Sequence, residues 1–463
     1  MKTNDLTFVI LGGTGDLARK KLIPSLFKLY RDDDLGQFDI IGTSRDDLSR
    51  EEYLRRVGVA LKGEEEWDSF KANIRFAQLD FYNSGDYLGL KEEVLDCSDN
   101  RMFYLATLPR HFDVITDNLA RHDLVNEKAK VLYEKPFGDD LRSAKKLNES
   151  IGKLFPEEKI YRIDHYLDKE LVGNLSILRF SNSIVEPLLK SNYVDHVQII
   201  ASEDFGVGER GEFYDNYGAV KDFFQSHLLQ LLSLVGMDAP DRLDARCIRD
   251  EKVDALKKVE ISDTLLGQYR GYREEDGVAE DSNTETLVAV RAGIDSSRWD
   301  GVPFYLLSGK NLMKKYAQIY IQFDQSDHDT LLGRDGTVPN SLVVSIQPDR
   351  GIYFKINTKV PGRIKTEPAK MEFCHACHHG PNTPSAYENL LSQAIAGDQR
   401  SFVRYDEIEE QWRIVEGMQK PEPFSYRPGR VPAEVKAFIQ NGVWHGLDGR
   451  ERDCSSRSER EAL

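Results

Sequence analysis

The sequence predicts an α/β domain with a doubly wound parallel sheet, followed by an α+β domain built on a large, mainly antiparallel sheet. Three observations support this fold class: the length of the chain, the order of its N-terminal runs and the alternation in its later runs. With 463 residues, 40% of them hydrophobic, the chain is too long for one ordinary core. The predicted domains span 1–160 and 161–448, and a polar tail at 449–463 is expected to fray.

Short β-rich runs alternate with amphipathic stretches in the first third of the chain. Apolar strands separated by helices are typical of a parallel sheet that helices cover on both faces. This pattern predicts a Rossmann domain. The predicted strands are 7–11, 38–42, 74–79, 102–106 and 130–133, and the first predicted helices are 16–30 and 49–61.

From about residue 160 the pattern changes to a helical stretch at 219–235 and then to runs with period-two alternation. Successive alternating runs without helices between them indicate antiparallel pairing. The predicted strands of this second sheet include 284–292, 316–323, 341–347 and 352–358.

The bulk composition excludes several classes of partner. A formal net charge of −16, without a basic stripe, argues against nucleic acid. No run approaches the roughly 18 to 20 apolar residues of a membrane span, and residues 1–17 do not fit a signal peptide. The five cysteines are odd in number and scattered, unlike a disulfide framework. We therefore expect a cytoplasmic protein that acts on small molecules.

A glycine-rich turn follows the first predicted strand directly and opens a predicted helix. Such a turn lets the backbone approach a pyrophosphate, whose charge then meets the helix N-terminus. The third glycine of the full dinucleotide fingerprint is missing, so an ordinary tight turn is the alternative interpretation. The predicted cofactor-binding residues here are Gly12, Gly13, Thr14, Gly15, Asp16 and Leu17.

Two residues with opposite preferences follow the second predicted strand, where a Rossmann domain contacts the adenosine ribose. Arg45 can pair with a 2′-phosphate, whereas Asp46 can accept a hydrogen bond from a free 2′-hydroxyl. We predict NADP as the cofactor because of Arg45, with NAD or dual use as the alternative.

Three further segments carry a family resemblance: EKPFG at 134–138, DHYLDKE at 164–170 and GAVKDFFQSHL at 218–228. Together with GGTGDLA, and from about residue 8 to 417, the chain resembles the glucose-6-phosphate dehydrogenase family. The resemblance implies oxidation of D-glucose 6-phosphate at C1 to 6-phosphogluconolactone with hydride transfer to NAD(P), the first step of the oxidative pentose phosphate pathway. The alternatives are a dehydrogenase of another hexose or hexose phosphate, and a non-catalytic relative that binds sugar phosphate.

His227 and Asp164 are the predicted catalytic residues. The unperturbed pKa of histidine lies near neutrality, so His227 can take the proton of the anomeric hydroxyl as hydride leaves C1. The resemblance assigns it as the general base, and it assigns Asp164 as the carboxylate that orients His227. Without the resemblance, a histidine among apolar residues such as His227 is more often a core histidine bonded to a carbonyl.

His165 and Lys169 are the predicted phosphate clamp. If their segment is helical, the i, i+4 spacing places both on one face about 6 Å apart, a suitable clamp for a phosphate dianion. Taken alone, the pair is typical of a solvated surface. The resemblance assigns both residues to the substrate phosphate.

The resemblance implies further substrate contacts. Lys135 is expected to bridge cofactor and substrate. A cis bond to Pro136 would turn this lysine inward, but the sequence leaves the isomer open. On an ideal α-helix Asp222 and His227 would be separated by about 140°, so both could touch one ligand only from its flanks. The remaining predicted substrate-binding residues are Glu203, Asp222, Lys310, Lys315 and Gln347.

Asp168 is the main departure from the family pattern, which has glycine at this position. An aspartate there is expected to crowd and repel the phosphate, unless it turns away or pairs with Arg162 or Lys169. Lys221 and Ser226 replace the usual arginine and asparagine and are milder changes.

The motif CHAC at 374–377 offers possible zinc ligands, but a structural site needs a second ligand pair. The resemblance places this region on a strand, where alternation would send Cys374 and Cys377 to opposite faces. We predict no metal. The resemblance and the long second sheet also favour a homodimer or a dimer of dimers.

Overall fold

A computed structural model describes residues 5–325, 337–363, 365–374, 377, 385–439 and 442–447. The chain forms two compact units. The first comprises Met1–Gly173, Pro240–Glu251 and Asn382–Trp412, and the second comprises Asn174–Ala239, Lys252–Pro381 and Arg413–Leu463. The predicted boundary after residue 160 stays a prediction, and the predicted tail at 449–463 lies outside the described residues.

The first unit contains a seven-stranded sheet in the order β15-β6-β5-β4-β1-β2-β3. All neighbours pair in parallel except β15 and β6. The order reverses between β1 and β4, and at such a point a Rossmann sheet opens a crevice for a dinucleotide. The strands are β1 (Leu6–Leu11), β2 (Phe38–Ser44), β3 (Ile74–Gln78), β4 (Arg101–Leu105), β5 (Lys130–Glu134), β6 (Ile160–Ile163) and β15 (Phe402–Val403).

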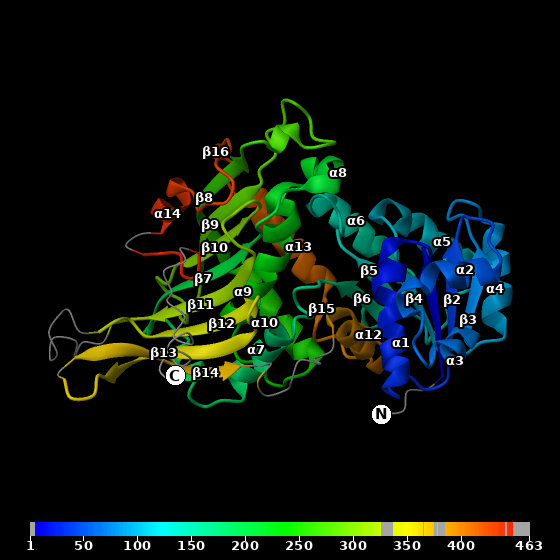
Figure 1. Ribbon diagram of the computed structural model, residues 1–463, viewed down its shortest axis with the longest axis horizontal. Coiled ribbons are helices and arrows are strands. Elements are labelled where there is room, and N and C mark those ends of the chain that lie inside the picture. The colour runs from blue at the N-terminus through cyan, green and yellow to red at the C-terminus, as the bar shows by residue number, and fades with distance from the viewer. Residues whose placement is uncertain are drawn as a thin grey trace. The chain divides into compact units, whose positions relative to one another are not determined.

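Helices cover both faces of this sheet (Figure 1). Phe8 and Ile10 of β1 belong to one apolar cluster, and Val9 and Leu11 belong to another. Successive residues of a strand point to opposite faces, so the two clusters confirm the predicted doubly wound domain. The helices here are the π-helix η1 (Ala18–Leu22), α1 (Ile23–Arg31), α2 (Arg50–Val57), α3 (Trp67–Ala72), α4 (Asp86–Leu95), α5 (Phe112–Arg121), α6 (Leu141–Gly152) and α12 (Ala386–Ala396).

The second unit contains a nine-stranded sheet in the order β14-β13-β12-β11-β7-β10-β9-β8-β16. Among the described strands of this second sheet, only the pairs β7–β10 and β8–β16 are parallel. The prediction of a mainly antiparallel sheet is therefore confirmed. The strands are β7 (Val194–Ser202), β8 (Val259–Tyr269), β9 (Leu287–Ile294), β10 (Phe304–Gly309), β11 (Tyr316–Phe323), β12 (Ser341–Gln347), β13 (Gly351–Lys359), β14 (Thr366–Cys374) and β16 (Phe424–Tyr426).

The predicted helix at 219–235 forms as two consecutive segments, the π-helix η7 (Val220–Leu228) and α9 (Leu229–Gly236). Every residue of α9 is buried. The remaining α-helices are α7 (Glu170–Phe180), α8 (Gly211–Asp215), α10 (Ala245–Lys257), α13 (Tyr405–Gly417) and α14 (Ala433–Phe438). Short 3-10 turns occur at η2 (Val59–Leu61), η3 (Pro109–His111), η4 (Glu157–Lys159), η5 (Glu186–Leu188), η6 (Gly208–Arg210) and η8 (Tyr272–Glu274). Within the described part, no helix is both long and apolar enough to cross a membrane.

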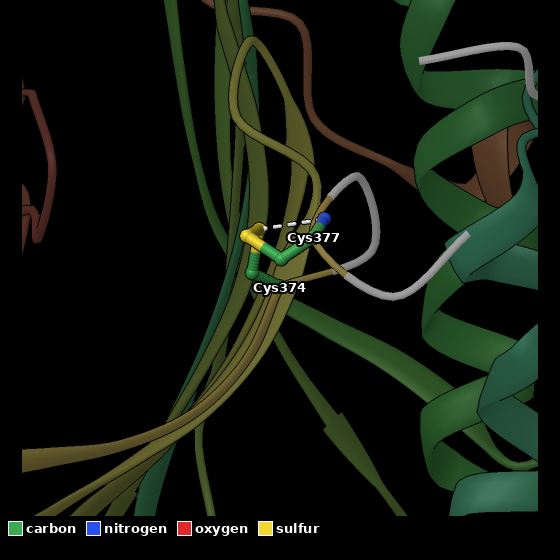
Figure 2. The surroundings of a disulfide bond; sticks show 2 residues. All are labelled: Cys374 and Cys377. Atoms are coloured by element: carbon green, nitrogen blue, oxygen red, sulfur yellow. Dashed lines mark hydrogen bonds between the residues drawn. A yellow bond between two sulfur atoms is a disulfide. The ribbon is translucent and has the colours of Figure 1, made fainter. Parts of the chain in front are cut away.

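The cysteine predictions need one correction. Figure 2 shows a disulfide between Cys374 and Cys377, with a Cα–Cα distance of 5.2 Å. The two residues do not occupy opposite faces, because β14 ends at Cys374 and the alternation of a strand no longer applies to Cys377. Cys97 and Cys247 are free. Burial raises the pKa of the Cys97 thiol to about 11, so this thiol is protonated at neutral pH.

Candidate active site

The glycine turn follows β1, at the point where the strand order reverses between β1 and β4. Gly12 has a φ of +96°, and a Cβ there would lie 2.6 Å from the carbonyl oxygen of Ala106. A Cβ on Gly13 would lie 2.9 Å from the hydroxyl of Tyr53. Both positions therefore require glycine. The open backbone that results, ahead of a helix N-terminus, fits the pyrophosphate of a dinucleotide.

Asp16 occupies the helix start, where a carboxylate would oppose a bound phosphate. Lys20 and Arg19 both bind this carboxylate, and the Lys20 contact measures 2.8 Å. These charged hydrogen bonds hold the pKa of Asp16 below its usual range. The hydroxyl of Thr14 donates to that of Ser44 at 3.0 Å and so connects the glycine turn to the end of β2.

The residues expected at the ribose differ in their surroundings. The guanidinium of Arg56 on α2 donates to Asp46 Oδ2 at 2.6 Å. Arg45 is exposed, and its backbone carbonyl accepts a hydrogen bond from Gln78 at 3.3 Å. The negative charge of Asp46 is thus compensated within the protein.

Lys135 follows β5 directly, and its bond to Pro136, whose isomer the sequence leaves open, is cis. The carboxylate of the preceding Glu134 accepts hydrogen bonds from the hydroxyls of Tyr104 and Tyr387.

The segment between β6 and α7 is a turn at residues 165–168, so the predicted helical spacing of the phosphate clamp is wrong. The local reason is Asp164, whose Oδ1 accepts the N–H of Tyr166 at 2.8 Å. Such a side-chain bond to the backbone two residues on favours a turn over a helix.

The ring of Tyr166 brings the two basic side chains of the clamp together. Lys169 Nζ lies 3.9 Å from the centroid of this ring. The ring of His165 packs against the same tyrosine with its centroid 5.3 Å away. His165 and Lys169 therefore flank one aromatic side chain, although no helix aligns them.

Asp168 turns into the interior of the first unit and is only 4% exposed. Its expected partners lie elsewhere: Arg162 binds Glu157 at 2.7 Å, and Lys169 lies over Tyr166. The concern that Asp168 would occupy the phosphate position does not apply to this orientation.

Four predicted substrate residues lie at the ends of four neighbouring strands of the second sheet. Glu203 and Lys310 follow the parallel strands β7 and β10, whose last residues pair, and Lys310 Nζ lies 2.6 Å from Glu203 Oε2. Lys315 precedes β11, whose first residue pairs with Ser202 at the end of β7. Gln347 ends β12 opposite Ala317 of β11. The register of four strands thus places these four residues at neighbouring strand ends.

Asp222 and His227 lie on the π-helix η7, which changes their predicted relation. Turns of a π-helix close from i to i+5, and the N–H of Leu229 donates to the carbonyl of Phe224 in this pattern. Asp222 and His227 are therefore one hydrogen-bonded turn apart, and the separation of about 140° expected for an α-helix is wrong. His227 has no exposed surface, and its ring packs edge-on to that of Phe223 at 5.2 Å.

Glu285 supports this helix and was not found from the sequence. Its carboxylate accepts the N–H of Val220 at 3.0 Å, and its backbone carbonyl accepts that of Ala219 at 2.9 Å. A Cβ on Gly218, where φ is +66°, would lie 2.4 Å from the Glu285 carboxylate. Glu285 caps the start of η7 from a position 65 residues away in sequence. A local sequence pattern therefore could not predict this cap.

The predicted site residues thus divide between the units. The cofactor turn, Arg45, Lys135, Asp164, His165 and Lys169 belong to the first, and Glu203, Asp222, His227, Lys310, Lys315 and Gln347 belong to the second.

Two family models that match this chain divide the predicted site residues in the same way. A family model described as "Glucose-6-phosphate dehydrogenase, NAD binding domain" matches residues 9–174, and one described as "Glucose-6-phosphate dehydrogenase, C-terminal domain" matches residues 176–445. The chain belongs to the glucose-6-phosphate dehydrogenase family. The NAD-binding domain of this family binds a nicotinamide cofactor, which agrees with the glycine turn of the first unit.

The matches to individual relatives cover nearly the whole of this chain and of each relative. Glucose-6-phosphate 1-dehydrogenase of Bacillus subtilis is 37% identical over 453 residues, 91% of this chain and 93% of the relative. That of Rhizobium meliloti is 40% identical, covering 89% of this chain and 90% of the relative. A solved glucose-6-phosphate dehydrogenase in complex with glucose 6-phosphate has a TM-score of 0.88 at 33% identity, covering 96% of this chain and 99% of that one.

Proposed function

We propose that the chain oxidises D-glucose 6-phosphate at C1 to 6-phosphogluconolactone, with NADP as the preferred hydride acceptor. The observation that carries the proposal is full-length membership in the family together with retention of Asp164 and His227, the two residues to which the resemblance assigns proton transfer. A relative without catalytic activity would not require a general base and the carboxylate that orients it.

His227 takes the proton of the C1 hydroxyl while the C1–H bond breaks and a C1=O bond forms. The nicotinamide ring, when bound, accepts the hydride from C1. Asp164 is oriented by the N–H of Tyr166 and is proposed to pair with His227, fixing its tautomer and stabilising the imidazolium. One proton and one hydride leave the sugar, which balances the oxidation to the lactone.

The remaining residues bind and orient the sugar in this proposal. His165 and Lys169 bind the phosphate, and Lys135 orients substrate and cofactor through its positive charge. Glu203 and Asp222 accept hydrogen bonds from sugar hydroxyls, and neighbouring cations and an amide complete the site. These last contacts are assigned to Lys310, Lys315 and Gln347.

An assay of reduced-nicotinamide absorbance with a panel of sugars tests the substrate. We expect glucose 6-phosphate to have the highest kcat/KM, because the phosphate adds charge-assisted contacts that free glucose lacks. The panel includes glucose, its epimers, and their 6-phosphates, each with NADP and NAD. Equal kcat/KM for glucose and glucose 6-phosphate, or a preference for an epimer, would overturn the proposed substrate.

The preference for NADP rests on Arg45. Because Arg56 compensates the charge of Asp46, a 2′-phosphate near Arg45 meets less repulsion than the sequence alone indicates. A charge-assisted bond of about 1.5 to 3 kcal/mol predicts that Arg45→Ala lowers the NADP/NAD ratio of kcat/KM by roughly tenfold or more.

Asp46→Ser is the variant of opposite sign. It removes a negative charge and releases Arg56, so the same ratio should rise. Steady-state kinetics with both cofactors measure each ratio. An unchanged ratio in Arg45→Ala would show that another residue selects the cofactor.

The compartment and the assembly of the enzyme are also proposals. We propose a cytoplasmic homodimer or dimer of dimers, and the family resemblance is the support for it. Light scattering on the purified chain measures the assembly, and cell fractionation measures the compartment.

A further inference from the structure

Three carboxyl groups lie near one another in the first unit, because β5 and β6 pair with Glu134 opposite Ile163. Asp164 and Asp168 belong to the turn between β6 and α7, and Glu134 ends β5 beside them. The negative charges of both Asp164 and Glu134 act on Asp168. Glycine is the family residue at position 168, so the third carboxyl is a feature of this chain.

The hydrogen-bond donors are unevenly distributed among the three groups. Glu134 accepts from two tyrosine hydroxyls, and Asp164 accepts from the N–H of Tyr166. In the described part of the chain, neither carboxyl oxygen of Asp168 has a hydrogen-bond partner, although the side chain is 4% exposed. An ionised carboxylate without donors is the costliest of these groups to bury.

The charged and titratable groups on the surrounding elements supply no hydrogen-bond donor to Asp168 in the described part of the chain. Tyr104 on β4 and Tyr387 on α12 direct their hydroxyls to Glu134. Burial raises the pKa of Glu134, and the hydrogen bonds from the two tyrosine hydroxyls and the charge of Lys135 offset this only in part. On the turn itself, Lys169 and His165 pack against Tyr166. Burial, and then the charges of Asp164 and Glu134, raise the pKa of Asp168 well above its usual range.

We propose that Asp168 is a positioning residue whose buried carboxyl keeps its proton in the working enzyme, so that the turn presents His165 and Lys169 to the substrate phosphate without an added negative charge. The role in phosphate binding rests on the proposed function, whereas the location of the proton does not. A neutral Asp168 replaces the family glycine without repelling the phosphate. An ionised Asp168 would add a negative charge that opposes the phosphate dianion.

The proton on Asp168 has a consequence for stability. The unfolded chain releases this proton near pH 4, whereas the folded protein keeps it to higher pH. The folded state therefore binds more protons, and its stability falls as pH rises between the two pKa values. Asparagine has nearly the same shape as the neutral acid and does not titrate, so Asp168→Asn removes this loss.

Thermal unfolding of wild type and Asp168→Asn from pH 5 to pH 8 tests the proton. The gap in Tm, variant minus wild type, should widen by roughly 1 to 3 °C per pH unit. The widening is the readout, because burial of the amide costs the same at every pH. Asp168→Gly should show the same widening, and Asp117→Asn on the exposed face of α5 should show none. A gap that stays constant with both variants at 168 would overturn the proposal.

KM measurements from pH 7 to pH 9.5 test the positioning role. The ratio of wild-type KM to variant KM for glucose 6-phosphate should rise about threefold or more as Asp168 ionises. The same ratio for free glucose should stay constant. A constant ratio for the phosphorylated sugar would overturn the positioning role. If wild type does not oxidise glucose 6-phosphate, the proposed function fails, while the Tm gap still decides whether Asp168 holds a proton.

Discussion

Replacement of His227 by asparagine is expected to lower kcat by about 10² to 10⁴, the usual contribution of a positioned general base. The amide preserves much of the size and hydrogen bonding of the imidazole but cannot take the proton from the C1 hydroxyl. KM should remain nearly unchanged, because the proposed phosphate contacts lie on other residues. Steady-state kinetics with glucose 6-phosphate measure both constants.

His196 provides a matched control in the same unit. It is a buried histidine whose Nδ1 lies 2.5 Å from the carboxylate of Asp195, so it resembles a histidine–aspartate pair of a catalytic site. It lies near the start of β7, however, whereas Glu203 follows the opposite end of that strand. His196→Asn should leave kcat within a few-fold of wild type. A His227→Asn variant within about threefold of wild type would remove His227 from the mechanism.

The sheets could be predicted from the sequence where one rule governed the segment. Strands β11 and β12 have the predicted bounds, because aromatic and β-branched residues are frequent in both runs, although apolar and polar residues do not alternate strictly. The glycine turn could be located for a similar reason, since steric contact with Ala106 and Tyr53 allows no side chain at Gly12 or Gly13.

The details of the candidate site depend on interactions that no local pattern contains. An apolar stripe at 219–235 predicts a helix, but it does not reveal the i to i+5 pairing that relates Asp222 to His227. The cap from Glu285 comes from the segment that precedes β9, 65 residues away in sequence. The turn at 165–168 replaces a helix because Asp164 bonds to the backbone of Tyr166.

Side-chain direction was equally inaccessible from the sequence. Asp168 was expected to crowd the phosphate because it replaces a glycine of the family pattern, unless its side chain turned away. The turn allows neighbouring side chains to diverge, and Asp168 is buried. The end of β14 likewise separates Cys377 from the strand that contains Cys374. In both cases the sequence identified the residues, but the path of the backbone set the relative positions of their side chains.

Lys169→Ala is expected to raise KM for glucose 6-phosphate by roughly 10- to 100-fold, since a charge-assisted hydrogen bond contributes about 1.5 to 3 kcal/mol. Tyr166 holds the ammonium 3.9 Å from its ring centroid, so the charge is oriented before the phosphate arrives. Free glucose lacks the phosphate, and its KM should change little. The ratio of the two KM values is the measurement.

Two further lysine variants show whether the effect depends on charge at that position. Lys169→Arg retains a cation and should recover part of the affinity, although its planar guanidinium differs in geometry from an ammonium. Lys146→Ala removes an exposed lysine from α6 and should leave both KM values close to wild type. Equal losses for glucose and glucose 6-phosphate in Lys169→Ala would mean that Lys169 does not contact the phosphate, and the clamp would then require another cation beside His165.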